Sequence, residues 1–295
     1  MQKKEKTKVS LVLGSGGARG LAHIGVIHWL EDNNYEIKSI SGCSMGSVIG
    51  GIYAAGKLDI FENWIKNITK TNMISLLDIS WGTSGIVKGD KIINTLKKLL
   101  GDRNIEDLPI SFTAVAADIK REKEIWINSG PLFDALRASV SLPLFFTPFN
   151  YNGVELIDGG VLNPVPIAPT FGDDTDITIA VNLGGAVINS NNNIVEEEKE
   201  EPSALQKIIS SVIDGFKPTK TKNKESNWSM YDIANQAFDA MQSTIARQKL
   251  AAYPPDYEII IARDAYDTFD FDLAKDIIDL GYSKINDTLG NKLIK

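Results

Sequence analysis

Cysteine and histidine are scarce in this sequence. The 295 residues include one cysteine, Cys43, and two histidines, His23 and His28. A single cysteine excludes a disulfide within the chain, which is typical of a protein from a reducing compartment. No histidines and cysteines cluster with metal-ligand spacing, so we expect no metal site. The two histidines lie five residues apart on one predicted helix, about 140° around its axis, so at most one can face a given site.

Positive charge and long apolar runs are also in short supply. Lysine and arginine total 31 against 38 aspartates and glutamates, a net charge of −7. Such a chain repels nucleic acid, and its charge argues against strong electrostatic binding to anionic membranes. The apolar run at residues 9–13 is too short for a signal peptide. One long uncharged stretch, residues 39–56, is too rich in glycine and serine for a membrane span. We therefore expect a soluble, cytoplasmic protein that does not bind nucleic acid.

The composition suits a globular core, with 43% apolar and 23% charged residues. Residues 8–13 are a short aliphatic run that predicts a buried strand. Glycines follow, and residues 18–33 then place Leu21, Ile24 and Ile27 at helical spacing. Residues 37–40 predict a second strand, which a second glycine turn joins to another helix. Two strand–turn–helix units in succession indicate a parallel sheet covered by helices, which is an α/β fold.

The remainder of the chain continues this alternation, and we expect a single domain over residues 1–295. One segment differs, because residues 189–228 are polar and contain an asparagine run and an acidic run. We interpret this segment as a flexible insertion within the domain, since charge runs are usually solvated. A lid or a lipid-contacting flap is the alternative. Further helices are expected at 59–69, 90–100, 131–139, 271–282 and 283–294, and further strands at 111–117, 123–127, 154–157, 176–182 and 258–261.

The pentapeptide Gly42-Cys43-Ser44-Met45-Gly46 matches the pattern G-x-S-x-G. It follows a predicted strand and opens a predicted helix, which is the context in which such a serine serves as a nucleophile. The flanking glycines allow a tight turn, and the helix N-terminus supplies amide groups and the positive end of a dipole beside Ser44. The alternative is a glycine-rich helix start with a capping serine. We predict that Ser44 is a catalytic nucleophile.

A second glycine-rich loop, residues 14–20 (GSGGARG), also joins a strand to a helix. Such a loop directs several backbone N–H groups at one point, as an oxyanion hole requires. It also resembles a nucleotide phosphate loop, but it has no P-loop lysine and no acidic residue ends the second strand. We therefore favour the oxyanion role. Arg19 opposes the helix dipole in the first turn, so it needs a partner. That partner is either a structural carboxylate or an anionic group of a substrate.

A serine nucleophile needs a proton acceptor. Asp158 is the preferred candidate because it follows a short apolar strand and precedes two glycines, which leave room for close approach. An ordinary Asp-Gly turn is the alternative. Asp118, at the end of another apolar run, is the second candidate. His23 is a third, which we expect to be a packing residue instead. A carboxylate suffices as the base where partial burial raises its proton affinity.

Together these three pieces resemble the patatin-like phospholipases, in particular the small bacterial branch of that family. The order of the pieces agrees, and Ser44 and Asp158 lie 114 residues apart (158 − 44). The resemblance covers residues 8–185 well. Cys43 stands where the family more often has threonine, and residues 189–228 have no counterpart, which leaves substrate access open. The matching residues are the loop at 14–20, the turn around Ser44, Asp158 with its two glycines, and Arg137-Ala138-Ser139 with Pro143.

The resemblance implies a three-layer α/β/α fold with a mostly parallel central sheet. It also implies a Ser44–Asp158 dyad that cleaves lipid acyl esters through an acyl-enzyme, with no metal or cofactor. The backbone N–H groups of Gly16 and Gly17, with Ala18 as a third candidate, would form the oxyanion hole. The substrate would be a lipid or another acyl ester, and transient contact with a membrane surface is compatible with this. Three alternatives are an acyltransferase at the same site, a non-catalytic scaffold protein and a nucleotide-binding module.

Overall fold

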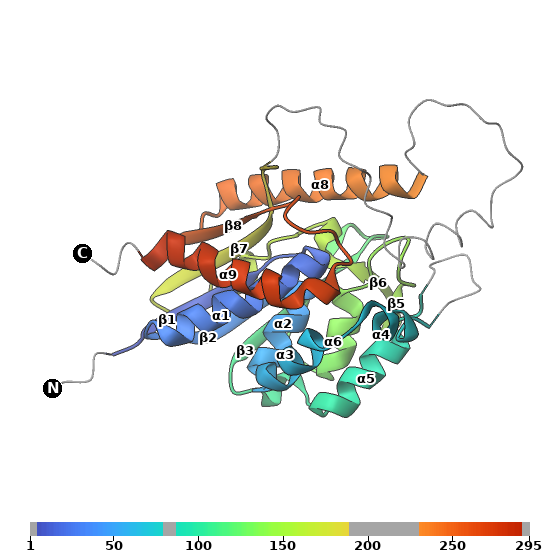
Figure 1. Ribbon diagram of the computed structural model, residues 1–295, viewed down its shortest axis with the longest axis horizontal. Coiled ribbons are helices and arrows are strands. Elements are labelled where there is room, and N and C mark those ends of the chain that lie inside the picture. The colour runs from blue at the N-terminus through green and yellow to red at the C-terminus, as the bar shows by residue number, and fades with distance from the viewer. Residues whose placement is uncertain (1–4, 79–86, 189–229, 291–295) are drawn as a thin grey trace, which may run out of the picture.

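A computed structural model describes residues 5–78, 87–188 and 230–290 (Figure 1). Within these ranges the strands form one sheet in the order β5-β6-β3-β2-β1-β7-β8, with β4 paired to β3. Parallel pairing joins β3, β2, β1, β7 and β8, and antiparallel pairing attaches β4, β6 and β5. The strands are β1 (Thr7–Leu13), β2 (Tyr35–Cys43), β3 (Ser111–Asp118), β4 (Lys123–Ile127), β5 (Phe149–Tyr151), β6 (Val154–Asp158), β7 (Ile177–Gly185) and β8 (Tyr257–Ala262).

The helices lie between these strands in the chain, except α9, which follows the last strand, and they cover the sheet (Figure 1). A short 3-10 helix, η1 (Gly17–Leu21), leads directly into the first α-helix, and another, η3 (Gly159–Val161), follows β6. The α-helices are α1 (Ala22–Asp32), α2 (Met45–Ala54), α3 (Leu58–Lys66), α4 (Lys70–Ser75), α5 (Asp90–Leu100), α6 (Leu132–Ser139), α8 (Met230–Ala252) and α9 (Ala274–Leu289).

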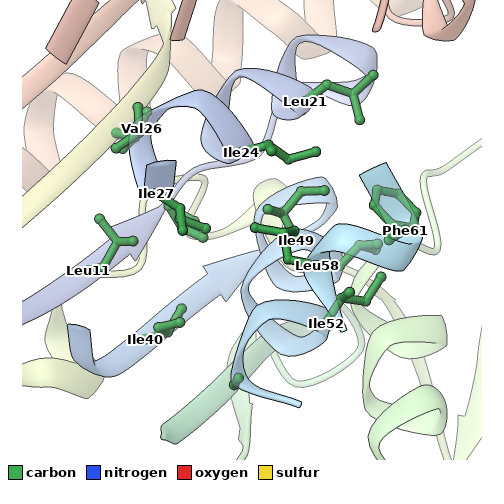
Figure 2. Close-up of a cluster of buried hydrophobic side chains, with 14 of the residues drawn as sticks. Leu11, Leu21, Ile24, Val26, Ile27, Ile40, Ile49, Ile52, Leu58 and Phe61 are labelled. Carbon is green, nitrogen blue, oxygen red and sulfur yellow. The ribbon is translucent and has the colours of Figure 1, made fainter. Parts of the chain in front are cut away.

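Alternate residues of β1 face two different helical layers. Leu11 and Leu13 belong to the main core, which also contains residues of α1, α2 and α9. Val12 belongs to a second cluster, which it shares with residues of α8. Figure 2 shows the first of these cores, where Ile24 of α1 and Ile49 of α2 gather beside the strands. Because both faces of the sheet are covered, the predicted three-layer α/β/α fold is confirmed.

The register of the strands brings the two glycine-rich loops and Asp158 to one edge of the sheet. Leu13 pairs with Gly42 in parallel register, so the loops that follow β1 and β2 lie side by side. β6 runs antiparallel to β3, and Asp158, its last residue, pairs with Ala116. The two glycine-rich loops and Asp158 therefore meet at the carboxyl ends of the parallel strands, where open α/β sheets bind ligands.

Most predicted elements are confirmed, and α5 and β4 begin and end at the predicted residues. Two expectations need correction, and one long helix was not predicted. The first helix starts with a 3-10 turn, so its α-helical part begins at Ala22 and not at residue 18. The two predicted closing helices, 271–282 and 283–294, are replaced by one continuous helix, α9, which runs through Gly281 because no proline interrupts it and a single glycine is tolerated within a helix. The sequence patterns do not predict the long helix α8.

The structure does not test two further predictions, which concern the insertion and the number of domains. The predicted insertion at residues 189–228 lies outside the described residues, and the single domain over residues 1–295 stays a prediction. Within the described ranges, no helix combines the length and the apolar character that crossing a bilayer requires.

Candidate active site

Ser44 lies in the tight turn between β2 and α2 with a strained backbone. Its φ of 54° and ψ of −124° fall in a region that residues other than glycine rarely adopt. A Cβ at Gly42 would lie 2.6 Å from the Gly46 carbonyl oxygen, and one at Gly46 would lie 2.1 Å from that of Leu13. Both glycines are therefore required by close backbone packing, as expected for a G-x-S-x-G turn.

Asp158 is buried beside this turn. Its Oδ1 accepts a hydrogen bond from the Gly160 N–H at 2.8 Å and a weak one from the Cys43 thiol at 3.9 Å. Burial raises the pKa of Asp158 from 3.8 to about 6, and hydrogen bonding from Ser44, Gly160 and Cys43 opposes that rise. Oδ2 has no partner of ordinary hydrogen-bond geometry in the described part of the chain. Hydrogen bonds between catalytic groups are often long before substrate binds. Oδ2 is therefore available to accept a hydrogen bond from the Ser44 hydroxyl.

The glycine-rich loop offers two of its three candidate donors. Among the described residues, no backbone acceptor bonds the N–H of Gly16 or Gly17. Gly17 also lines the same cavity as Ser44. The Ala18 N–H, in contrast, donates to the Thr268 carbonyl oxygen at 2.9 Å, so it is not available to an oxyanion. The prediction that Ala18 contributes to an oxyanion hole is therefore wrong, and Gly16 and Gly17 remain as the candidate donors.

The Arg19 side chain binds the segment between β8 and α9. Its Nη1 donates to the carbonyl oxygens of Arg263 and Tyr266 at 2.8 and 2.9 Å. Its Nη2 lies 3.9 Å from Asp239 of α8. Burial lowers the pKa of Arg19, and the negative charge of Asp239 opposes that change. Of the two alternatives for Arg19, the structure supports the internal partner and not contact with an anionic substrate.

The two histidines have partners away from the nucleophile. His23 is fully buried, and its Nε2 lies 2.8 Å from the Gly14 carbonyl oxygen, to which it must donate. Burial lowers the pKa of His23 to about 4, so this histidine is a packing residue, as expected. His28 pairs with Glu62 of α3 at 3.1 Å. In the described ranges, no three or more His, Cys, Asp or Glu residues cluster in a way that could hold a metal ion.

Asp118, the second candidate base, lies in a different environment. Its Oδ2 accepts a hydrogen bond from the Arg121 guanidinium at 2.7 Å. This bond lowers the pKa of Asp118, which makes its carboxylate a weaker proton acceptor. Asp158 is the carboxyl whose surroundings raise its proton affinity, and it is the one beside Ser44.

An apolar cavity of about 130 Å³ adjoins Ser44. Its walls come from α2, α3, α4, α5, the segment 140–146 and the segment 268–271, and none of the described residues that line it is charged. A cavity of this kind suits a hydrocarbon chain. The sequence analysis does not identify it, because its walls are far apart in the chain. Representative lining side chains are Val48, Phe61, Trp64, Leu96, Phe145 and Phe269.

Two contacts at the site are absent from the sequence predictions. Ser139, whose Oγ accepts the Ser44 N–H at 2.9 Å, belongs to a segment that the family resemblance includes without a role. Thr268 packs on the glycine-rich loop so closely that a Cβ at Gly17 would lie 2.6 Å from its Cγ2. No local pattern marks Thr268, because its partner lies 251 residues earlier (268 − 17).

The fold and the sequence comparisons together indicate a protein of the lipid-hydrolase class. The sequence model of the family described as Patatin-like phospholipase matches residues 11–171, which include both Ser44 and Asp158. The chain belongs to the patatin-like phospholipase family.

Similar proteins include members of the NTE family. An NTE family protein of Mycobacterium tuberculosis (strain ATCC 25618 / H37Rv) is 35% identical over 93% of this chain and 89% of its own length. Lysophospholipase NTE1 of Saccharomyces cerevisiae is 31% identical over 60% of this chain, which corresponds to 11% of that protein. Among solved structures, VipD from Legionella pneumophila matches 96% of this chain and 67% of its own chain with 14% identity and a TM-score of 0.45.

Proposed function

We propose that this protein hydrolyses the acyl esters of lipids, with Ser44 as the nucleophile and Asp158 as its base. The observation that carries the proposal is the position of Ser44 between a buried carboxylate and an apolar cavity. A pKa of about 6 leaves Asp158 charged at neutral pH yet basic enough to take a hydroxyl proton. Membership of the patatin-like phospholipase family supports the same chemistry.

The reaction begins when Asp158 takes the hydroxyl proton of Ser44 and the serine oxygen attacks the ester carbonyl carbon. The N–H groups of Gly16 and Gly17 hydrogen-bond the oxyanion that forms. Asp158 then returns the proton to the oxygen of the leaving alcohol, and the acyl chain stays on Ser44. Water attacks this acyl-enzyme with Asp158 again as the base, which releases the fatty acid and restores the serine.

The apolar cavity defines which part of the substrate is recognised. A hydrocarbon chain that enters it leaves water, and burial of each methylene group contributes about 0.8 kcal/mol. The described lining has no charged side chain to bind a head group, so the polar part of the lipid remains at the cavity mouth. The relatives named lysophospholipase support a substrate derived from phospholipids.

Hydrolysis of p-nitrophenyl acyl esters by point variants tests the proposal. Ser44→Ala and Asp158→Asn should each lose about 10³-fold or more of the wild-type kcat. Asp118→Asn and His23→Gln, which leave the dyad intact, serve as folded controls and should remain active. The wild-type rate should fall as the pH drops below about 6, because a protonated Asp158 cannot accept the serine proton.

The same experiment identifies a wrong assignment. Wild-type activity in Asp158→Asn, or loss of activity in a folded His23→Gln, would show that the base is another residue. Full activity in Ser44→Ala would exclude the serine mechanism altogether. Adding an acceptor alcohol and measuring the new ester against free fatty acid separates hydrolysis from acyl transfer at the same site.

A further inference from the structure

The C-terminal end of α6 and the residues just after it contact both members of the proposed dyad. The Oγ of Ser139 accepts a hydrogen bond from the Ser44 N–H at 2.9 Å. Two residues later, the carbonyl oxygen of Ser141 accepts the Asp158 N–H at 2.9 Å. Ser139, Ser141 and Asp158 are all fully buried. One short segment is therefore bonded to the backbone of the nucleophile and to the backbone of the base.

We propose that residues 137–141 act as a strut that sets the separation of Ser44 and Asp158, and that Ser139 is a positioning residue for the nucleophile. The proposal rests on the proposed function, because it gives the strut the task of holding that dyad. Ser139 itself does not touch the reacting atoms. It acts through the backbone of Ser44.

The two hydrogen bonds of the Ser139 hydroxyl show that it is an acceptor, and not a donor, toward Ser44. A hydroxyl group carries one proton, and the Ser139 hydroxyl donates that proton to the Val115 carbonyl oxygen at 2.6 Å. Its oxygen is then left as an acceptor for the Ser44 N–H. Ser139 is therefore not a proton relay to the Ser44 hydroxyl, and it connects the nucleophile turn to β3, next to the strand that ends in Asp158.

The nucleophile turn needs such support because its conformation is unfavourable. Ser44 has a positive φ, which side-chain-bearing residues adopt only where neighbouring groups enforce it. Its carbonyl oxygen is held from the helix side by the N–H and hydroxyl groups of Ser47. Its N–H is held by Ser139. Removing the Ser139 hydroxyl leaves the partly buried Ser44 N–H without this acceptor and lets the turn relax.

Arg137 holds the strut in place. Its Nη1 donates to the Ser141 hydroxyl at 2.6 Å, and that hydroxyl donates back to the Arg137 carbonyl oxygen at 2.8 Å. Its Nη2 donates to the Thr147 carbonyl oxygen at 3.0 Å and to that of Lys88. The guanidinium also lies over the Phe146 ring, 5.4 Å from its centroid. The turn is therefore fixed at both ends by groups outside the dyad.

Ser139→Ala tests the proposal, with Ser41→Ala as the matched control. Both serines are buried, but Ser41 Oγ has no hydrogen-bond partner in the described part of the chain. The readouts are kcat and KM on a p-nitrophenyl ester, the rate of labelling by a fluorophosphonate, and the melting temperature. Ser139→Ala should lose about 10- to 100-fold in kcat and in labelling rate. KM should stay within about twofold because the acyl cavity is untouched, and Ser41→Ala should match the wild type.

The following outcomes decide whether Ser139 positions the nucleophile or only stabilises the fold. A folded Ser139→Ala that melts earlier but keeps its kcat and labelling rate overturns the strut, because Ser139 would then serve stability alone. If Ser139→Ala does not fold, Ser139→Cys is tested instead. A thiol has nearly the size of the hydroxyl but is a poor hydrogen-bond acceptor, so the same rate loss is expected.

Ser44→Ala is labelled in parallel to separate a failure of the strut from a failure of the proposed function. Its loss of labelling beside an unaffected Ser139→Ala refutes the strut alone, whereas retained labelling refutes the proposed function and the strut together.

Discussion

Asp158, the proposed base, combines a raised proton affinity with a cost to stability. Burial raises its pKa from 3.8 to about 6, so the charged carboxylate is less stable in the folded chain than in the unfolded chain. One pKa unit corresponds to about 1.4 kcal/mol, so at neutral pH the charge costs at most about 3 kcal/mol. The cost applies in full above pH 6. It vanishes below pH 3.8, where the carboxyl is neutral in both states.

We predict that Asp158→Asn is more stable than the wild type at pH 7, by up to about 3 kcal/mol. The neutral amide removes the buried charge, and its oxygen can still accept the Gly160 N–H. The advantage should shrink as the pH falls from about 6 to 4, and urea unfolding at several pH values measures it. Asp118→Asn is the control: the pKa of Asp118 is lowered by Arg121, so that variant should lose stability at neutral pH. A less stable Asp158→Asn at pH 7 contradicts the argument.

For single residues, the sequence predicts a role where that role depends on residues close by in the chain. Ser44 and Asp158 each stand in a short pattern of strand and glycine, and the structure brings both to one edge of the sheet. The roles of Ala18 and Arg19 depend on carbonyl oxygens of residues 263–268, almost the whole chain away. No local pattern contains that information, so the third oxyanion donor and the substrate contact could not be decided in advance.

Two of the helices that line the apolar cavity, α3 and α5, are short and amphipathic, and each contributes one apolar face. α5 directs Ile92, Ile93 and Leu96 into the cavity, while Leu99 on the same helix is 36% exposed. The spacing of three and four residues places the lining side chains on one stripe. The width of the cavity beside α5 therefore depends on the size of these three side chains.

We predict that Leu96→Trp shortens the acyl chain that the protein accepts. The larger ring fills part of a cavity of about 130 Å³, so kcat/KM for long-chain p-nitrophenyl esters should fall about tenfold or more. Activity on the acetate ester should change little, because an acetyl group needs none of that space. Leu99→Trp, at the exposed position of the same helix, should leave both rates unchanged. Equal losses on short and long esters in Leu96→Trp would place the ester chain elsewhere.

A helix could be predicted from the sequence where many large apolar residues recur at helical spacing. α5 has such a stripe, and its predicted bounds agree with the structure. α8 does not, since its buried positions include the small or polar residues Ser243 and Ala246 beside Leu250. A narrow stripe of small side chains gives a weak helical pattern, even though it allows close approach to the sheet. The cavity itself could not be predicted, because it exists only once separate helices are packed together.

The whole molecule contributes to the site through its C-terminal part. The family match ends at residue 171, yet the segment between β8 and α9 binds Ala18 through Thr268 and places Phe269 in the cavity wall. This segment is held in place by α9, which packs along α1. The contact is very close, because a Cβ at Gly281 of α9 would lie 2.0 Å from the Ala22 carbonyl oxygen.

Gly281→Ala should therefore weaken the protein and its site together. The added methyl group meets backbone and not a flexible side chain, so the two helices must separate, at a cost of about 1–3 kcal/mol in the free energy of unfolding. α1 continues directly from η1, which contains Gly17, so the displacement should also slow fluorophosphonate labelling of the folded fraction. Gly172→Ala is the control, because a Cβ at Gly172 meets nothing within 4 Å. Wild-type stability and labelling in Gly281→Ala would show that the site does not depend on the packing of α9.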